Sequence, residues 1–208
     1  MIQRKGTKPY KLTNAVLIGD YEEVDGLELR TLTKNDADKS TLSGLILKAY
    51  EMKFADANAN GERYDKTAFD NFINEYYVAH SLNMPLTILH GWDLEHLAGR
   101  VLVMEVNSVG VYYVCYVPRT YPRYDDVRNK IKEGILQGLS KEGWATDYDF
   151  IYNEKGEFDH VQIHAMDITA LSIVSTPANA LGFERAQEVA NALKFERKKT
   201  TIADYLKK

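Results

Sequence analysis

The 208-residue sequence lacks the features that mark several classes of protein. It has one cysteine, Cys115, so no disulfide can form within the chain, as is usual in a reducing compartment. Cys115 lies in the apolar run 109–117, and we expect it to be a small buried hydrophobic residue. No apolar run approaches the length of a membrane-spanning helix. The basic N-terminus has no apolar segment after it, which is not the pattern of a secretory signal.

Positive charge is also scarce. The chain has 26 Lys and Arg against 30 Asp and Glu, and this net charge of −4 argues against a nucleic-acid-binding protein, because phosphate binding needs concentrated positive charge. A hydrophobic content of 45% is typical of a soluble globular protein. We expect one cytoplasmic domain over residues 1–208, with a basic N-terminal arm at about 1–14 and a loosely held, charged C-terminal tail at about 194–208.

Alternating and apolar segments dominate the chain and predict a β-rich domain. The predicted strands are 15–18, 27–32, the first part of 42–52, 86–90, 98–106, 109–117, 146–152 and 160–174. The short break at 107–108 predicts a hairpin between two of these strands. Apolar residues recur at helical spacing in 66–77, 125–136 and 183–195. The pattern therefore indicates a mostly β domain with a few helices.

One polar loop has a partial metal-binding pattern. Asp56, Asn58, Asn60 and Gly61 match the first half of an EF-hand calcium loop. The twelfth position, where calcium needs a bidentate glutamate, is Thr67, and no predicted helix precedes the loop. We interpret the segment as an Asn- and Gly-rich turn. A calcium-binding module is the weaker alternative.

The segment 137–144, QGLSKEGW, contains a candidate nucleophile, Ser140. A serine attacks a carbonyl only when an imidazole removes its proton, so a serine enzyme needs a nearby histidine. His90 is the best placed of the five histidines, because it ends an apolar strand and by alternation shares a face with Leu86 and Ile88. Ser140 lacks the G-x-S-x-G elbow of the α/β-hydrolases. These residues alone therefore suggest a serine–histidine pair only weakly.

The order of several short motifs resembles the bacteriophage prohead (capsid maturation) protease family, which is related in fold to the herpesvirus assemblins. The matching segments are Ala-Phe at 68–69, LHGWD at 89–93, Gly-Arg-Val at 99–101, Gly-Leu-Ser at 138–140 and LSIVSTPAN at 171–179. Together they extend over about residues 40–180, most of the chain. The resemblance implies an α+β fold, a mostly antiparallel β-barrel flanked by helices.

The resemblance also implies a serine endopeptidase with His90 as general base and Ser140 as nucleophile. Two positions depart from the family pattern. One extra residue separates Ser140 from the following Gly-aromatic pair, and a glutamate common two residues before the serine of the last strand is replaced by Ala170. By alternation His164 shares the face of Ala170, so we expect it to be the third catalytic residue. Asp167 is the runner-up and would need a β-bulge to reach that face.

Two rival serines, Ser172 and Ser175, lie in the last strand, and we interpret them as packing or hydrogen-bonding residues. Backbone N–H groups near 141–143 are the expected oxyanion donors. No metal and no cofactor is implied.

The resemblance implies scaffold and major capsid proteins as substrates, and cleavage of the chain itself, inside an assembling procapsid in the host cytoplasm. Neither nucleic acid nor a membrane is an expected partner, and a homo-oligomeric state is left open. The rival interpretation is a catalytically inactive structural relative with the same barrel, which the missing glutamate at Ala170 keeps open.

Overall fold

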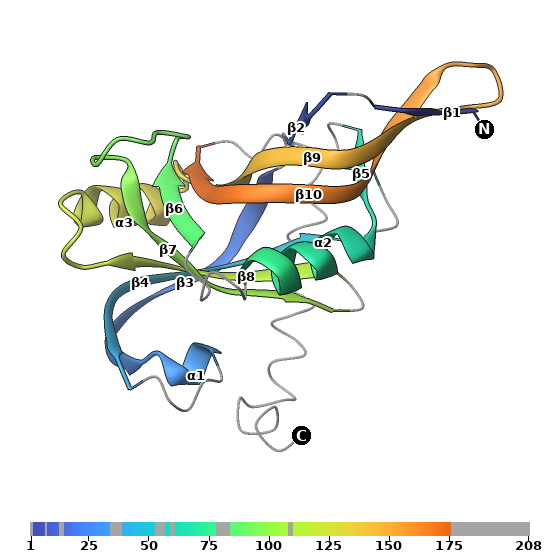
Figure 1. Cartoon of the computed structure of the whole chain (residues 1–208). Helices are drawn as coiled ribbons and strands as arrows, with labels where there is room; N and C mark the ends of the chain where they lie inside the picture. The colour runs from blue at the N-terminus through green and yellow to red at the C-terminus, as the bar shows by residue number, and fades with distance from the viewer. Residues whose placement is uncertain are drawn as a thin grey trace, which may run out of the picture.

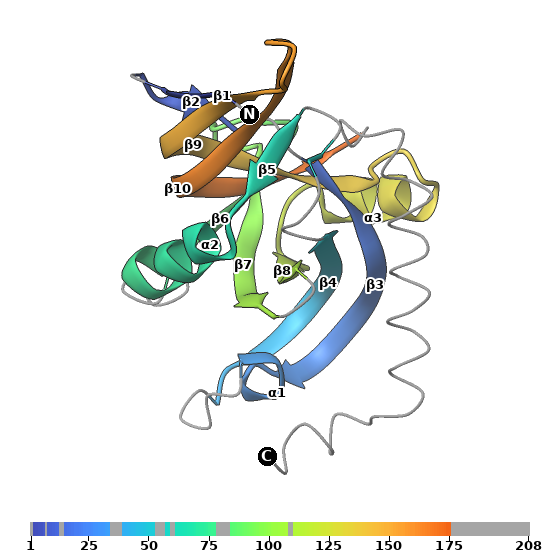
Figure 2. The same ribbon diagram turned by 90° about the vertical axis from the view of Figure 1, so that its right-hand side faces the viewer.

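A computed structural model describes residues 2–6, 8–12, 15–33, 39–52, 57–58, 61–77, 84–107 and 110–175. Its centre is a sheet of ten strands, seven of which close into a barrel (Figures 1 and 2). In spatial order the barrel strands are β9 (Gly138–Tyr152), β3 (Ala15–Glu28), β4 (Thr41–Met52), β8 (Gly110–Pro118), β7 (Leu97–Val106), β6 (Met84–Ile88) and β10 (Phe158–Val174). The ring is closed because β10 pairs again with β9.

Three short strands extend the sheet outside the barrel. The strands β1 (Ile2–Lys5) and β2 (Tyr10–Lys11) pair antiparallel with β9, and β5 (Glu62–Tyr64) pairs with β10. Among the described strands the parallel pairings are those of β10 with β5 and of β10 with β6. The prediction of a mostly antiparallel barrel is therefore confirmed.

The helices are few and short, and they lie outside the barrel (Figure 1). They are α1 (Arg30–Thr33), α2 (Lys66–Phe72), continued by the π-helical turn η1 (Ile73–Tyr77), and α3 (Tyr124–Lys132). The apolar stripe of α2 contributes Ala68, Phe69 and Phe72 to the core, as its helical spacing predicts. No described helix is long and apolar enough to cross a membrane.

The main core fills the barrel because its strands alternate inward apolar and outward polar residues. Leu45 and Leu47 of β4 belong to this core, and Cys115 of β8, which pairs with Leu47, is fully buried as predicted. Burial raises the pKa of the Cys115 thiol strongly, so the thiol stays protonated. A second, smaller cluster on the outer side of β4 includes Ile46 and is covered by Leu29.

One predicted strand was wrong. The segment 27–32 was predicted as a strand, but β3 ends at Glu28 and α1 begins at Arg30. Leu29 and Leu32 lie three residues apart, a spacing that suits a helical turn, and the turn is closed by a hydrogen bond from Leu32 N to Leu29 O. The expected N-terminal arm contains β1 and β2, both paired with β9. The predicted helix 183–195 and the tail from 194 lie outside the described residues.

Gly99 of β7 offers a test of the barrel packing. A Cβ at this position would lie 1.9 Å from the backbone oxygen of Tyr116 on β8, and a backbone atom in a paired strand cannot move aside. We expect Gly99→Ala to lower the free energy of unfolding by about 1–3 kcal/mol, measured by urea denaturation. Gly26→Asn is the control, because Gly26 has open space around it and a positive φ that asparagine tolerates. Equal stability of the two variants would contradict this account.

Candidate active site

Three neighbouring strands bring three hydroxyl side chains into one row. Thr87 of β6 pairs with Ser172 of β10, and Ser172 pairs with Ser140 of β9. Residues directly opposite in adjacent strands have Cβ atoms about 4.5–5.5 Å apart on the same face of the sheet. Leu139 and Lys141, the neighbours of Ser140, point to the inner face, so the row lies on the outer face of the barrel.

His90 follows this row through a turn at the end of β6. The N–H of Leu89 still donates to the carbonyl of Ile173 on β10 (2.9 Å). Leu89 and His90 then take φ values of 50° and 60°, which are uncommon for residues with side chains. The turn ends the alternation of the strand, so the prediction that His90 shares a face with Leu86 and Ile88 was wrong. Those two residues are in the core, whereas the side chain of His90 is 47% exposed.

Ser172 fixes the backbone of this turn. Its Oγ accepts a hydrogen bond from the His90 N–H at 2.8 Å, and the residue is fully buried. The structure therefore brings His90 next to the strand pair that carries Ser140. The interpretation of Ser172 as a hydrogen-bonding residue is confirmed. Ser175 lies exposed beyond the end of β10.

A carboxylate that the sequence interpretation did not consider lies beside His90. Glu142 Oε1 is 3.4 Å from His90 Nδ1 and accepts a hydrogen bond from Thr87 Oγ1 at 2.7 Å. Glu142 Oε2 accepts a hydrogen bond from Trp92 Nε1 at 2.8 Å. Glu142 lies two residues after Ser140 in a strand, and strand alternation places both on one face. That spacing is a sequence signal that could have indicated Glu142.

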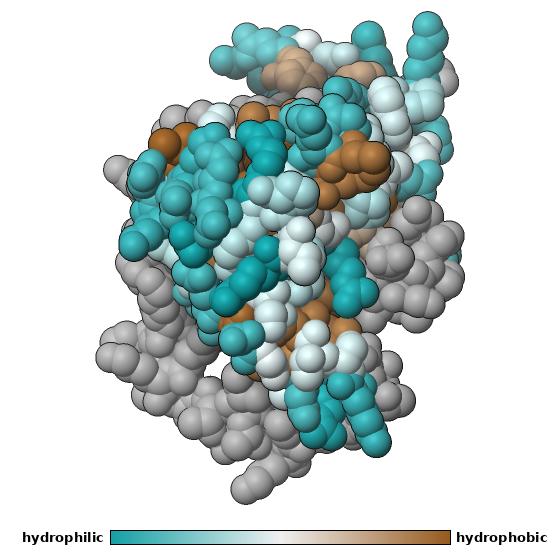
Figure 3. All heavy atoms as spheres, turned by 90° about the vertical axis from the view of Figure 1, so that its left-hand side faces the viewer, coloured by the Kyte–Doolittle hydropathy of each residue, from teal (hydrophilic) through white to brown (hydrophobic). Residues whose placement is uncertain are grey.

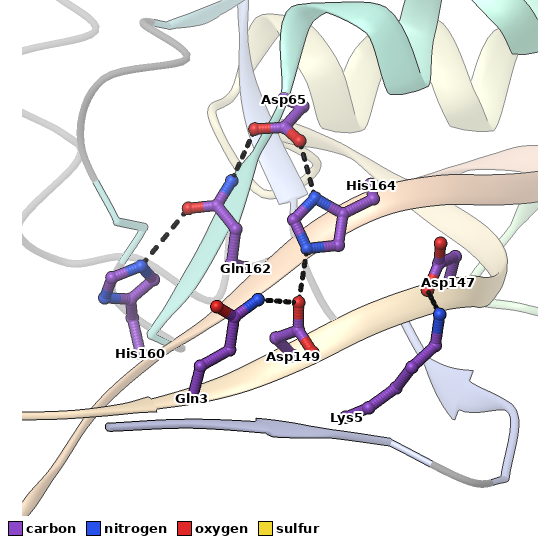
Figure 4. A network of polar contacts seen from close by, with 8 residues as sticks. All are labelled: Gln3, Lys5, Asp65, Asp147, Asp149, His160, Gln162 and His164. Atoms are coloured by element: carbon purple, nitrogen blue, oxygen red, sulfur yellow. Dashed lines mark hydrogen bonds and ion pairs between the residues drawn. The ribbon is translucent and has the colours of Figure 1, made fainter. Parts of the chain in front are cut away.

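His164 lies elsewhere, in a second polar network (Figure 4). Its Nδ1 is 2.6 Å from Asp65 Oδ2 and its Nε2 is 2.7 Å from Asp149 Oδ2, so both ring nitrogens are occupied by carboxylates. His164 is eight residues before Ser172, about 25 Å along β10 at ~3.3 Å per residue. The structure thus does not bring His164 to His90.

The same network attaches the N-terminal strand. Gln3 of β1 donates from Nε2 to Asp149, and Lys5 of β1 forms an ion pair with Asp147 at 2.9 Å (Figure 4). Burial lowers the pKa of His164, but the hydrogen bonds with the two carboxylates outweigh it and raise the pKa above its ordinary value. Burial by itself raises the pKa of Asp149. The hydrogen bonds from Gln3 and His164 lower this pKa by more, so the net shift is downward.

The remaining candidates are dispersed. Asp167 is exposed on β10 opposite Trp144. His96 lies 2.6 Å from Asp93, and His160 is buried beside Asp159 and Gln162. His80 lies outside the described residues.

In the Asn- and Gly-rich loop that matches half of a calcium loop, Asp56 and Asn60 lie outside the described residues. The side chain of Asn58 in this loop accepts a hydrogen bond from the Glu62 N–H through Oδ1 and donates one from Nδ2 to Glu62 Oε2. The described part of the chain holds no group of three or more His, Cys, Asp or Glu side chains arranged to bind a metal ion.

Apolar side chains are exposed next to His90. Leu89, Trp92, Leu94 and Leu97 are each more than one third exposed and lie within one loop and the start of β7. The corresponding end of the molecule, with β6 and α3, faces the viewer in Figure 3, where separate apolar areas interrupt a hydrophilic surface. An extended peptide bound near His90 would therefore meet apolar as well as polar groups.

In this closed β-barrel a serine of β9 and a histidine that follows β6 lie on the two sides of β10, and a serine with a nearby histidine is the arrangement that serine peptidases use. Residues 30–195 match the Caudovirus prohead serine protease family, and the chain belongs to this family. The structure is similar to that of the capsid assembly protease gp21 of bacteriophage T4, with a TM-score of 0.61 and 15% sequence identity over 81% of this chain and 99% of that chain. The search of curated proteins found no match. The protein is therefore a serine protease of the prohead, or capsid assembly, class.

The network around His164 gives a prediction for pH dependence. A raised pKa means that protonated His164 stabilises the fold fully below about pH 6.5, and that this contribution is lost as pH rises through the folded-state pKa. We expect thermal melting of the wild type to show this loss, and the His164→Gln protein to lack it.

The same variant tests a catalytic role. Diisopropyl fluorophosphate labels activated serines. The His164→Gln protein should react with it within about threefold of the wild-type rate, because the His164 ring of the wild type contacts Asp65 and Asp149 and neither His90 nor Ser140. A folded variant that reacts far more slowly would return His164 to the active site.

Proposed function

We propose that Ser140 and His90 are the nucleophile and general base of an endopeptidase that cleaves scaffold and capsid protein segments as the procapsid matures. The observation that supports this most is the hydrogen bond from His90 N to Ser172, the residue opposite Ser140. Family membership supports the reaction class. The substrates follow from the capsid assembly role of the family and from the name of the similar T4 protease.

The reaction would proceed in two steps, acylation of the serine and hydrolysis of the acyl-enzyme. Ser140 Oγ attacks the scissile carbonyl carbon while its proton passes to His90 Nε2. The protonated imidazole then gives that proton to the leaving amine as the C–N bond breaks, and an acyl-enzyme remains. Water, deprotonated by His90, attacks the ester and releases the acid and the free serine. Backbone N–H groups near 141–143 are the proposed donors to the oxyanion.

Ser140 has a low exposure in the free protein, 6%. A substrate must therefore reach its hydroxyl from the outer face, where the small side chain of Ala170 and the turn at His90 are its neighbours. The exposed apolar residues of the loop 89–97 border that route. An extended segment of scaffold protein fits such an approach better than a compact domain does.

The nucleophile can be tested without knowledge of the cleavage site. Diisopropyl fluorophosphate should add covalently to Ser140 of the wild type, detected by peptide mass spectrometry, and not to Ser140→Ala. His90→Ala should slow labelling by about 10³-fold or more. Both single variants and the double variant should also be equally unable to process capsid and scaffold proteins in co-expressed procapsids.

Ser172→Ala is the matched control for the neighbouring serine. It removes the acceptor of the His90 N–H but not the nucleophile, so the labelling rate should fall by about tenfold rather than to zero. Full labelling of Ser140→Ala at Ser172 or Ser175 would contradict the assignment. Complete absence of labelling in the folded wild type would favour the inactive structural relative.

We propose in addition that the enzyme removes its own C-terminal tail. The segment from Lys194 is rich in charged residues and poor in apolar residues until Ile202. A sequence of this composition has few residues to bury, so we expect a protease to reach it easily. Wild-type protein should lose mass near this segment on long incubation, measured by intact-mass spectrometry, whereas Ser140→Ala should keep its full mass. Identical full-length masses of both proteins would exclude trimming.

A further inference from the structure

The His90 ring needs a partner at Nδ1 if Nε2 is to receive the serine proton. An acceptor at Nδ1 fixes the tautomer and orientation of the ring and stabilises the imidazolium formed during reaction. The two residues expected from the sequence, His164 and Asp167, do not contact the ring in this structure. The Nδ1 atom instead faces Glu142 Oε1 at 3.4 Å.

Glu142 is itself held in a fixed position. Its Oε1 accepts from Thr87 Oγ1 at 2.7 Å, and its Oε2 accepts from Trp92 Nε1 at 2.8 Å. Its backbone oxygen accepts from Thr169 Oγ1 at 3.0 Å. The side chain is 12% exposed, so solvent screens its charge only partly. Both side-chain donors are neutral, and the negative charge therefore remains available to stabilise a protonated His90.

The position of Glu142 also accounts for the residue at 170. The sequence resemblance leads to a glutamate at this place, whereas the chain has Ala170. Ala170 lies on β10 directly opposite Glu142 of β9, next to a register shift, and Thr87 lies on the far side of β10. The methyl group of Ala170 leaves room for the Glu142 side chain to pass over β10 and reach Thr87. A carboxylate on one strand thus occupies the region that a carboxylate on the opposite strand would fill.

We infer that Glu142 is the positioning residue of the active site, holding His90 through Nδ1 in place of an acidic residue on β10. This inference rests on the proposed roles of Ser140 and His90. The distance of 3.4 Å is longer than a hydrogen bond, and His90 is half exposed. Catalytic contacts are commonly long in free enzymes and shorten when substrate covers the site. The neighbouring ionisable residues Asp93 and His96 pair with each other at 2.6 Å.

The test uses Glu142→Gln in the full chain, which keeps the shape of the side chain and removes its charge. The pseudo-first-order labelling of Ser140 by diisopropyl fluorophosphate should slow by about 10²-fold or more at the optimal pH. The acid limb of the pH–rate profile should move to lower pH, because the imidazolium loses the carboxylate that stabilises it. A purely structural role would lower the rate without moving this limb.

Conservative and control variants complete the design. Glu142→Asp should recover part of the rate, and Trp92→Phe, which removes one donor but leaves the carboxylate, should slow labelling by about threefold to tenfold. Glu133→Gln, an exposed carboxylate after α3, should label within about twofold of the wild type. In a His90→Ala background, Glu142→Gln should cause no further loss, because its effect acts through His90.

The outcomes separate this inference from the proposed function. Wild-type rates and an unmoved acid limb in Glu142→Gln, with Ser140→Ala inactive, would overturn the role of Glu142 and leave the protease assignment intact. Strong slowing in folded His164→Gln or Asp167→Asn, with Glu142→Gln unaffected, would transfer the role to that residue. If Ser140→Ala were still labelled and active, the proposed function itself would fail.

Discussion

The antiparallel pairing of β9 with β10 fixes both the barrel and the geometry around Ser140. It closes the barrel, and its register places Ser140 opposite Ser172 and Glu142 opposite Ala170. Because side chains alternate with a period of two, a slip of one residue would turn Ser140 toward the core and Lys141 outward. The core opposes such a slip, since Leu139 and Leu171 on the two strands are both buried in it.

The β10 strand also explains how an unusual turn is tolerated at His90. Two consecutive side-chain-bearing residues with positive φ cost free energy, on the order of 1–3 kcal/mol each. Two hydrogen bonds to β10 offset part of this cost, one from Leu89 to Ile173 and one from His90 to Ser172. The same bonds hold His90 beside the strand pair that carries Ser140. Backbone strain is thus located at the proposed general base.

His164 and His90 both face carboxylates, but their surroundings differ in a way that suits them to different roles. His164 of β10 has a carboxylate at each ring nitrogen, an arrangement that favours the charged ring and connects β10 with β9, β1 and the start of α2 (Figure 4). His90 has one carboxylate, at Nδ1, and a half-exposed ring. A general base must alternate between neutral and protonated states, so the surroundings of His90 suit it better.

Patterns in the sequence predicted most of the strands, the hairpin from 98 to 117 and the apolar face of α2, while the serine–histidine pair came from the family resemblance. These features are local, because hydrophobic periodicity follows from strand and helix geometry within a few residues. The sequence pattern failed at His90, because alternation was extended through a turn, where it does not hold. His164 lies eight residues before Ser172 on β10, and a shared strand face gives no information on distance along the strand.

Which carboxylate faces His90 depends on how distant strands pair. Glu142 and His90 are 52 residues apart in the chain. Their approach depends on the strand order β6, β10, β9, on the parallel register of β6 with β10 and on the antiparallel register of β10 with β9. Ala170 matters for the same reason, since its small size has meaning only beside Glu142. Contacts of this kind arise from long-range strand pairing, which no local pattern of residues encodes.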